Sequence, residues 1–202
     1  TPTSGGWSGW LRKKSAIWPA RRDGDDILLF ADETRSAPIA RLPMLRQQVA
    51  KREGRANDCL ADFVSPDADW IGGFAVTAGH GIEAKLAEFR AAHDDYSGIL
   101  LKALADRFAE AAAEALHFRI RTDHWGYERL AVPDYPGLIR EQYQGIRPAP
   151  GYPACPDHSL KPLLFDLLDA PARTGISLTE SFAMLPTAAV SGFYFAHPQS
   201  HY

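Results

Sequence analysis

One short segment of the chain gathers residue types that could bind a polar ligand. Residues 147–158 read Arg-Pro-Ala-Pro-Gly-Tyr-Pro-Ala-Cys-Pro-Asp-His. Each proline fixes its own φ near −65° and pushes the preceding residue toward extended geometry, so we expect residues 147–156, here called the strap, to be stiff and mostly extended. A strap with free backbone groups can hydrogen-bond a ligand. The Arg147 guanidinium can pair with a carboxylate, and Tyr152 offers a ring beside Gly151, which permits close approach.

A purely structural role for the strap fits its local chemistry equally well. Residues 147–156 could be a rigid connector between two helices, with Arg147 capping a helix end. The residue types alone therefore leave a ligand site and a connector both open.

Helical patterns surround the strap and would position it. Short helices are expected at Leu138–Tyr143 and at Leu160–Leu168, the latter with Ser159 as N-cap. Earlier in the chain, a helix is expected from Ile82 to about Ala92, and a longer one from Ser97, as N-cap, to about Arg121. The long helix has an apolar stripe that should bury one face against a sheet. This stripe consists of Leu100, Leu101, Leu104, Phe108, Ala112, Ala115 and Leu116.

Strand patterns lie toward both ends of the chain. Residues 15–19 and 26–30 flank an Arg-Asp-Gly-Asp turn and predict a hairpin, and residues 71–77 predict a third strand. Residues 175–178, 181–184 and 188–196 are typical of closing strands, whereas residues 38–51 predict an amphipathic helix started or interrupted at Pro43. Strands at both ends with a helical middle indicate an α+β fold with a mostly antiparallel sheet. We expect residues 1–16 to be a flexible or truncated segment and residues 17–202 to be one domain.

Composition excludes several classes of protein. The net charge is −3 over 202 residues, which argues against nucleic-acid binding, and no apolar run approaches the ~20 residues that span a bilayer. Cys59 and Cys155 are too few for a disulfide framework, so a cytoplasmic protein is the default. Cys155 and His158 have the spacing of half a metal site, but no second Cys/His pair lies near them in the sequence. We therefore predict no metal site.

Other catalytic patterns are weak. No Gly-x-Gly-x-x-Gly sequence occurs, so the nucleotide-binding turn of a Rossmann-type methyltransferase is missing. The groups at 93–95, His-Asp-Asp, and 123–124, Asp-His, resemble acid/base pairs. Both stand at expected helix ends, where polar residues serve as caps. No serine or cysteine has the motif context of a nucleophile.

Several segments together resemble a known family. These are the strap with its continuation to His158, Leu-Thr-Glu-Ser-Phe-Ala-Met at 178–184 and Val-Ser-Gly-Phe-Tyr-Phe-Ala-His-Pro at 190–198. Shorter matches occur in the same order at residues 24–27, 45–48, 74–79 and 104–107. The chain is in this respect similar to the S-adenosylmethionine-binding activation domain of cobalamin-dependent methionine synthase. The resemblance covers the chain from about residue 17 to its end.

The resemblance implies a fold and a ligand site. The fold would be a C-shaped α+β unit with a twisted antiparallel sheet, and S-adenosylmethionine would bind in a shallow groove on the strap. Arg147 would hold the ligand's carboxylate, and the main chain of Pro148, Ala149, Pro150 and Gly151 would hydrogen-bond its adenine. Tyr152 would face the cobalamin and is our one expected catalytic residue, Tyr202 would contact the ligand, and Tyr194 is a further ring that could line the groove.

The ligand's ammonium group needs an acidic partner. Glu141 is the nearest acidic candidate in the sequence, and its alternative interpretation is a solvated helix carboxylate next to Arg140. In the family this partner comes from an arm upstream of the segment that matches Ile17, and no match for that arm is present.

The resemblance also implies a reaction. The domain would support the reductive remethylation of cob(II)alamin to methylcobalamin, with the methyl group from S-adenosylmethionine and an electron from flavodoxin or a similar reductase. Cobalamin would be bound by a partner module of the 5-methyltetrahydrofolate-homocysteine methyltransferase, so the chain would not be a complete enzyme alone. The unmatched arm and the stop at Tyr202 keep an alternative open, a non-catalytic S-adenosylmethionine-binding or docking domain that acts as a stand-alone accessory protein.

Overall fold

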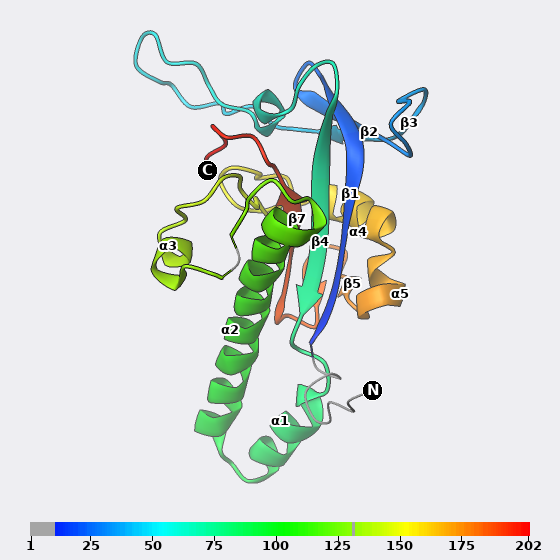
Figure 1. The fold of residues 1–202 in the computed structure, drawn as a ribbon. Helices are drawn as coiled ribbons and strands as arrows, with labels where there is room; N and C mark the ends of the chain where they lie inside the picture. Colours follow the sequence, from blue (N-terminus) through cyan, green and yellow to red (C-terminus); the bar gives the residue numbers. More distant parts are fainter. Residues whose placement is uncertain (1–10, 131) are drawn as a thin grey trace.

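A five-stranded antiparallel sheet forms the centre of the fold. The computed structural model describes residues 11–130 and 132–202. Strand order across the sheet is β3-β2-β1-β4-β7, and every neighbouring pair is antiparallel (Figure 1). The strands are β1 (Arg12–Asp23), β2 (Asp26–Phe30), β3 (Pro38–Pro43), β4 (Asp69–Thr77) and β7 (Ala189–Tyr194). The predicted α+β class with a mostly antiparallel sheet is confirmed.

The hairpin that opens the sheet is longer than its sequence pattern indicates. β1 and β2 pair from Ala20 opposite Leu29 to Asp23 opposite Asp26, and Gly24 in the turn has a φ of 66°, which suits glycine. β1 begins at Arg12. Residues 12–16 therefore belong to the sheet, although the predicted boundary put them in a flexible or truncated segment. The part of that segment before Leu11 lies outside the described residues.

Helices cover both faces of the sheet. The helices are α1 (Ile82–Ala91), α2 (Asp95–Arg119), α3 (Tyr135–Ile139), α4 (Leu160–Leu168) and α5 (Ala170–Thr174), with a 3₁₀ helix η1 (Leu60–Phe63) and a π-helical turn η2 (Ile120–His124). α2 packs on one face, against β4 and β7, while α4 and α5 pack on the other (Figure 1). A small second sheet pairs β5 (Ser177–Leu178) with β6 (Met184–Leu185).

Side-chain alternation along β4 divides the core between these two faces. Phe74 and Val76 are buried in a cluster with α2, whereas Ile71 and Ala75 are buried in the larger cluster with α4. Strand residues two apart share a face. Tyr194 of β7 accordingly joins the α2 side, and its neighbour Phe193 joins the α4 side.

The helix predicted over residues 38–51 is wrong. Residues 38–43 form β3, in which Leu42 is fully buried opposite Ile27 of β2. Leu45 and Val49, which share helical spacing with Leu42, are 58% and 61% exposed. Pairing with β2 thus decides the structure of this segment, although Leu42, Leu45 and Val49 have helical spacing. The strand β3 ends at Pro43.

Other element bounds shift by a few residues. α2 begins at Asp95 because the Asp94 carboxylate, not Ser97, is the N-cap and accepts the Ser97 N–H at 3.0 Å. α3 spans 135–139 instead of 138–143, with a proline in its first turn. α4 has the predicted bounds. β5 and β6 are two-residue strands, shorter than the patterns at 175–178 and 181–184 indicate. Within the described part of the chain, no helix is both long and apolar enough to cross a membrane.

Candidate functional site

The strap is fastened to the end of β7 by main-chain hydrogen bonds. Ile146 and Phe195 exchange two bonds of 2.9 and 3.0 Å, and the Phe193 N–H donates to the Pro148 carbonyl at 2.9 Å. A Cβ added at Gly192 would lie 2.5 Å from that carbonyl oxygen. Glycine at position 192 therefore allows the strap to approach the strand closely.

The strap then turns back on itself, so fewer of its backbone groups are free than its prolines suggest. The Gly151 N–H donates to the Cys155 carbonyl at 2.7 Å, and the Tyr152 N–H donates to the Ala149 carbonyl at 3.2 Å. The expectation of a mostly extended strap with free backbone is wrong for these groups. Among the described residues, the Ala149 N–H and the carbonyls of Pro150 and Gly151 are still without a hydrogen-bond partner.

A cavity of about 480 Å³ opens between the strap, the sheet and α2, and we call it the strap cavity. It brings together five of the predicted site residues, which come from the strap and from the C-terminal residue: Arg147, Pro148, Ala149, Tyr152 and Tyr202. The sheet contributes Phe74 and Val190, and α2 contributes Glu110. The cavity thus combines a cation, an anion and aromatic rings, which is the mixture that a charged ligand with apolar parts requires.

A second cavity, of about 340 Å³, adjoins the first, and we call it the side cavity. Predicted residues Pro150 and Gly151 line this one and not the strap cavity. Four residues line both cavities: Glu110, Ala149, Tyr152 and Val190. Tyr152, which is 63% exposed, is therefore in contact with whatever occupies either space.

Arg147 is held by a cluster behind the strap cavity. Its Nη2 lies 2.6 Å from a Glu114 carboxylate oxygen, and its Nη1 donates to Tyr143 Oη at 2.9 Å and lies 3.3 Å from His117 Nδ1. The Arg147 main-chain N–H donates to Tyr202 Oη at 3.0 Å, which brings the C-terminal residue to the cavity. A guanidinium has five N–H donors, so this cluster fixes Arg147 and still leaves donors for a ligand carboxylate.

The floor beneath this cluster is a buried polar layer. His117 is fully buried, and burial together with the positive charges of Arg121 and Arg147 holds its pKa well below the usual range, so the imidazole is neutral. Arg121 is also fully buried and donates to Glu128 at 2.9 Å, with its guanidinium 3.8 Å from the centre of the Tyr143 ring. These contacts give Arg147 a rigid support.

Tyr194 does not line the groove, contrary to the expectation from sequence. Its ring is fully buried, stacked between Phe74 at 4.7 Å and His117 at 5.1 Å. The alternation of β7 directs it toward α2, below the cavity and not into it.

The carboxylate of the strap cavity is Glu110, which the sequence analysis missed. Glu141, the predicted acidic residue, is exposed in the turn after α3 and lines neither cavity. Glu110 lies on α2, far from the strap in sequence, and no local signal separates it from the other carboxylates of that helix. Only the packing of α2 beside the strap identifies it.

The remaining candidates are structural. Burial raises the pKa of the Cys155 thiol to about 12, so it stays protonated, and the described residues contain no cluster of three or more metal-binding side chains. Asp94 caps α2, and Asp123 accepts a hydrogen bond from Thr122 at 2.9 Å. The expected capping role fits Asp94, whereas the side-chain bonds of Asp123 are to Thr122 and Arg119 and cap no helix end.

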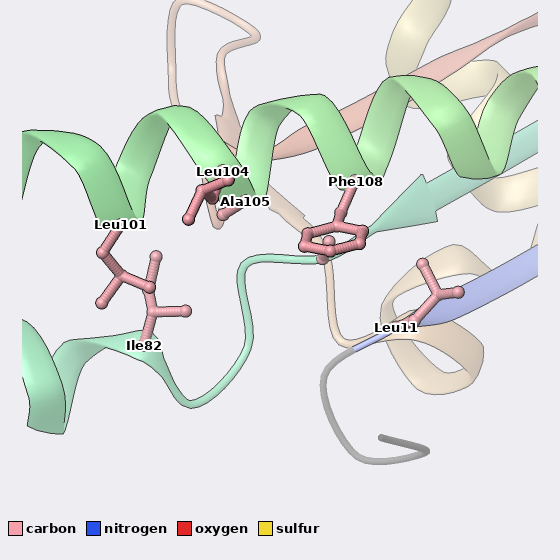
Figure 2. A pocket seen from close by; sticks show the side chains of 7 residues that line it. Leu11, Ile82, Leu101, Leu104, Ala105 and Phe108 are labelled. Atoms are coloured by element: carbon pink, nitrogen blue, oxygen red, sulfur yellow. The ribbon is translucent and has the colours of Figure 1, made fainter.

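A further cavity, of about 350 Å³, lies between α1, α2 and the start of β1. Figure 2 shows side chains of both helices and Leu11 pointing into it. The lining is apolar: Leu11, Ala78, Ile82, Leu101, Leu104, Ala105 and Phe108. Such walls cannot orient a polar ligand, so the strap cavity is the stronger candidate for function.

Comparison with known proteins identifies the family of the chain. The profile of the family described as "Vitamin B12 dependent methionine synthase, activation domain" matches residues 8–202. A solved structure, "Crystal Structure of the MetH Reactivation Domain bound to AdoHcy", matches with a TM-score of 0.91 and 54% sequence identity. The match covers 95% of this chain and 60% of that one, so this chain spans about three fifths of the solved chain's length.

Proposed function

Because the chain belongs to the family of vitamin B12 dependent methionine synthase activation domains, we propose that it binds S-adenosylmethionine in the strap cavity and presents its methyl group to cobalamin held by a partner module. The observation that carries this proposal is the convergence of Arg147, Glu110, Tyr152 and Tyr202 on one cavity. The related solved structure contains AdoHcy, which is S-adenosylmethionine without the transferred methyl group.

Each charged part of the ligand has a complementary group in the cavity. Arg147, fixed by Glu114 and Tyr143, offers N–H donors to the carboxylate. Glu110, across the cavity on α2, offers a carboxylate to the ammonium. The Ala149 N–H, free among the described residues, is the available strap donor for an adenine nitrogen.

The aromatic residues suit the sulfonium and the adenine. Tyr152 and Tyr202 are 63% and 52% exposed and line the open side of the cavity, where a ring can stack on adenine or face a cation. Cobalamin, when bound by the partner and reduced, supplies the nucleophile that accepts the methyl group. The part of this chain is to hold the sulfonium methyl in line and to exclude water, and Tyr152 is the residue we place at that contact.

The wider assignment follows from the family. The chain would act as a module of a 5-methyltetrahydrofolate-homocysteine methyltransferase, with the cobalamin-binding module as its partner and flavodoxin or a similar reductase as the electron donor, in the cytoplasm. The methyl group and the electron together would return oxidised cob(II)alamin to methylcobalamin.

Calorimetric titration with S-adenosylmethionine tests the proposal. Arg147→Ala and Glu110→Gln should each weaken binding by about 1.5–3 kcal/mol, the range for a hydrogen bond to a charged group, which is roughly tenfold or more in Kd. Arg140→Ala is the matched control because Arg140 is exposed, donates to Gln142 through its side chain and lines neither cavity. Binding that resists both substitutions, or no binding by the folded chain, would refute the site.

A second assay separates reactivation from simple binding. The chain is mixed with a cobalamin-binding module of a methionine synthase and a chemical reductant, and methylcobalamin is followed by its absorption spectrum. Methylcobalamin formation that requires both the chain and S-adenosylmethionine would support reactivation. Ligand binding with no methyl transfer would instead favour the non-catalytic binding or docking domain.

A further inference from the structure

The side cavity contains polar groups that the proposed S-adenosylmethionine site does not use. Lys161 of α4 and Ser191 of β7 line it, and they are only 7% and 2% exposed. Ser191 Oγ is buried and has no hydrogen-bond partner among the described residues. A buried hydroxyl without a partner is costly, which suggests that a ligand supplies the missing bond.

Lys161 also has capacity left for a ligand. Its ammonium group donates to the Phe182 carbonyl at 3.1 Å and lies 3.0 Å from His158 Nδ1, which accepts when the imidazole carries its proton on Nε2. An ammonium has three N–H donors, so one is unused. The His158 ring in turn packs against Gly151, where an added Cβ would meet it, so the strap and Lys161 are held together.

The charges of the side cavity select a neutral ligand group. Lys161 supplies a positive charge and Glu110 a negative one, so neither an anion nor a cation is attracted by both, whereas a neutral group with an acceptor and a donor can bond to each of them. A primary carboxamide has a carbonyl that accepts from Lys161 and Ser191, and an NH₂ group that donates to Glu110. The other walls include Met184 and Val190, whose apolar side chains can pack against a short alkyl arm.

We propose that the side cavity is a carboxamide site that receives one of the amide-bearing arms at the rim of the corrin ring of cobalamin. This inference rests on the proposed function. Tyr152 lines both cavities, so a corrin ring that faced Tyr152 at the strap cavity would bring its rim toward the side cavity. Lys161 and Ser191 thus help to dock the methyl acceptor, while Arg147 holds the methyl donor.

The test measures the two partners separately. The affinity for S-adenosylmethionine comes from calorimetry. The affinity for the acceptor comes from the concentration of chain that gives half-maximal methylcobalamin formation with a cobalamin-loaded module. The variants are Lys161→Met and Ser191→Ala, and Lys85→Met is the control because Lys85 forms an exposed ion pair on α1, away from both cavities.

The expected result is a shift in only one of these quantities. Lys161→Met should raise the half-maximal concentration on the order of tenfold, and Ser191→Ala by about threefold, from the usual worth of charged and neutral hydrogen bonds. S-adenosylmethionine affinity and the maximal rate should be unchanged, as should every value for Lys85→Met. Ser191→Ala removes an atom that bonds to nothing in the described chain, so it tests the site even if Lys161→Met fails to fold.

Two negative results have different meanings. An unchanged half-maximal concentration in Ser191→Ala and in folded Lys161→Met, with normal S-adenosylmethionine binding, would overturn the carboxamide site and leave the proposed function standing. A wild-type chain that fails to bind S-adenosylmethionine in the calorimeter would overturn the proposed function, and the carboxamide site with it.

Discussion

Gly192 offers a direct test of how the strap is held, because a single methyl group there would separate two parts of the site. In Gly192→Ala the new Cβ would lie 2.5 Å from the Pro148 carbonyl oxygen, 3.1 Å from Phe74 Cε1 and 3.2 Å from Ala149 Cα. Two of these atoms belong to strap backbone and cannot rotate away. The strap must therefore move off β7 for alanine to fit.

The expected cost has two parts. Overpacking in a close-packed region costs about 1–3 kcal/mol. The shift also weakens the hydrogen bond from the Phe193 N–H to the Pro148 carbonyl, worth about 1 kcal/mol. We therefore expect Gly192→Ala to lower the free energy of unfolding by about 2–4 kcal/mol. Its S-adenosylmethionine affinity should also fall, because Pro148 and Ala149 form one wall of the strap cavity.

Urea unfolding followed by circular dichroism measures the stability, and calorimetry measures the affinity. The control is the same chemical change elsewhere, Gly98→Ala. Gly98 lies in α2, and the nearest atom to an added Cβ there is Leu86 Cδ2 at 4.0 Å. Alanine in this helix should stabilise the chain by about 0.5–1 kcal/mol, so the two glycine variants should change stability in opposite directions.

The reasoning fails on one clear result. If Gly192→Ala is within about 0.5 kcal/mol of wild type, the size of an ordinary surface change, and binds S-adenosylmethionine normally, then close contact between strap and strand is not what positions the site.

Two further predictions concern the buried layer behind Arg147. Glu128→Ala should lower the free energy of unfolding by about 3–5 kcal/mol in urea titration, because it leaves the fully buried Arg121 without its 2.9 Å partner; a change below 1 kcal/mol would contradict a buried ion pair. His117 should make stability pH-dependent. The pKa of His117 is depressed in the folded state, so only the unfolded chain takes up a proton below about pH 6.5. The free energy of unfolding should therefore decrease as the pH is lowered, by up to about 1.4 kcal/mol per pH unit. His117→Phe should lose that slope below about pH 6.5, whereas an unchanged slope would assign it to other groups.

Local patterns predicted the elements that depend on local interactions. The bounds of α4 follow from apolar spacing, and the turn between β1 and β2 follows from turn chemistry at Gly24, although β1 is longer than its pattern indicates. The spacing of Leu42, Leu45 and Val49 misled because a helix and a strand can both bury Leu42. The partner that decides between them is β2, which no window around Leu42 contains.

The predicted residues that line the strap cavity lie on the strap itself or at Tyr202. Arg147 and Tyr152 stand in a motif, and the structure brings both to the strap cavity. Glu110 could not be found from sequence, because its place in the wall of the strap cavity arises from the packing of α2 against β4 and β7. Glu141 was favoured by its closeness in the chain, but a turn with a φ of 52° at Glu141 leaves it outside both cavities.

The pairing of β4 with β7 constrains the order in which the strands of the sheet can pair during folding. The hydroxyl of Thr77 donates to the carbonyl of Ala188, which is 111 positions later in the chain. Closing a loop of that length costs about 4 kcal/mol beyond a constant, so this contact forms late and slows folding. During synthesis β1 to β4 can pair early, while the outer edge of β4, with Phe74, Ala75 and Val76, stays unpaired until β7 emerges. The nascent chain therefore carries an apolar, aggregation-prone strand edge. The strap cannot take its final position until β7, to which it is hydrogen-bonded, has been synthesised.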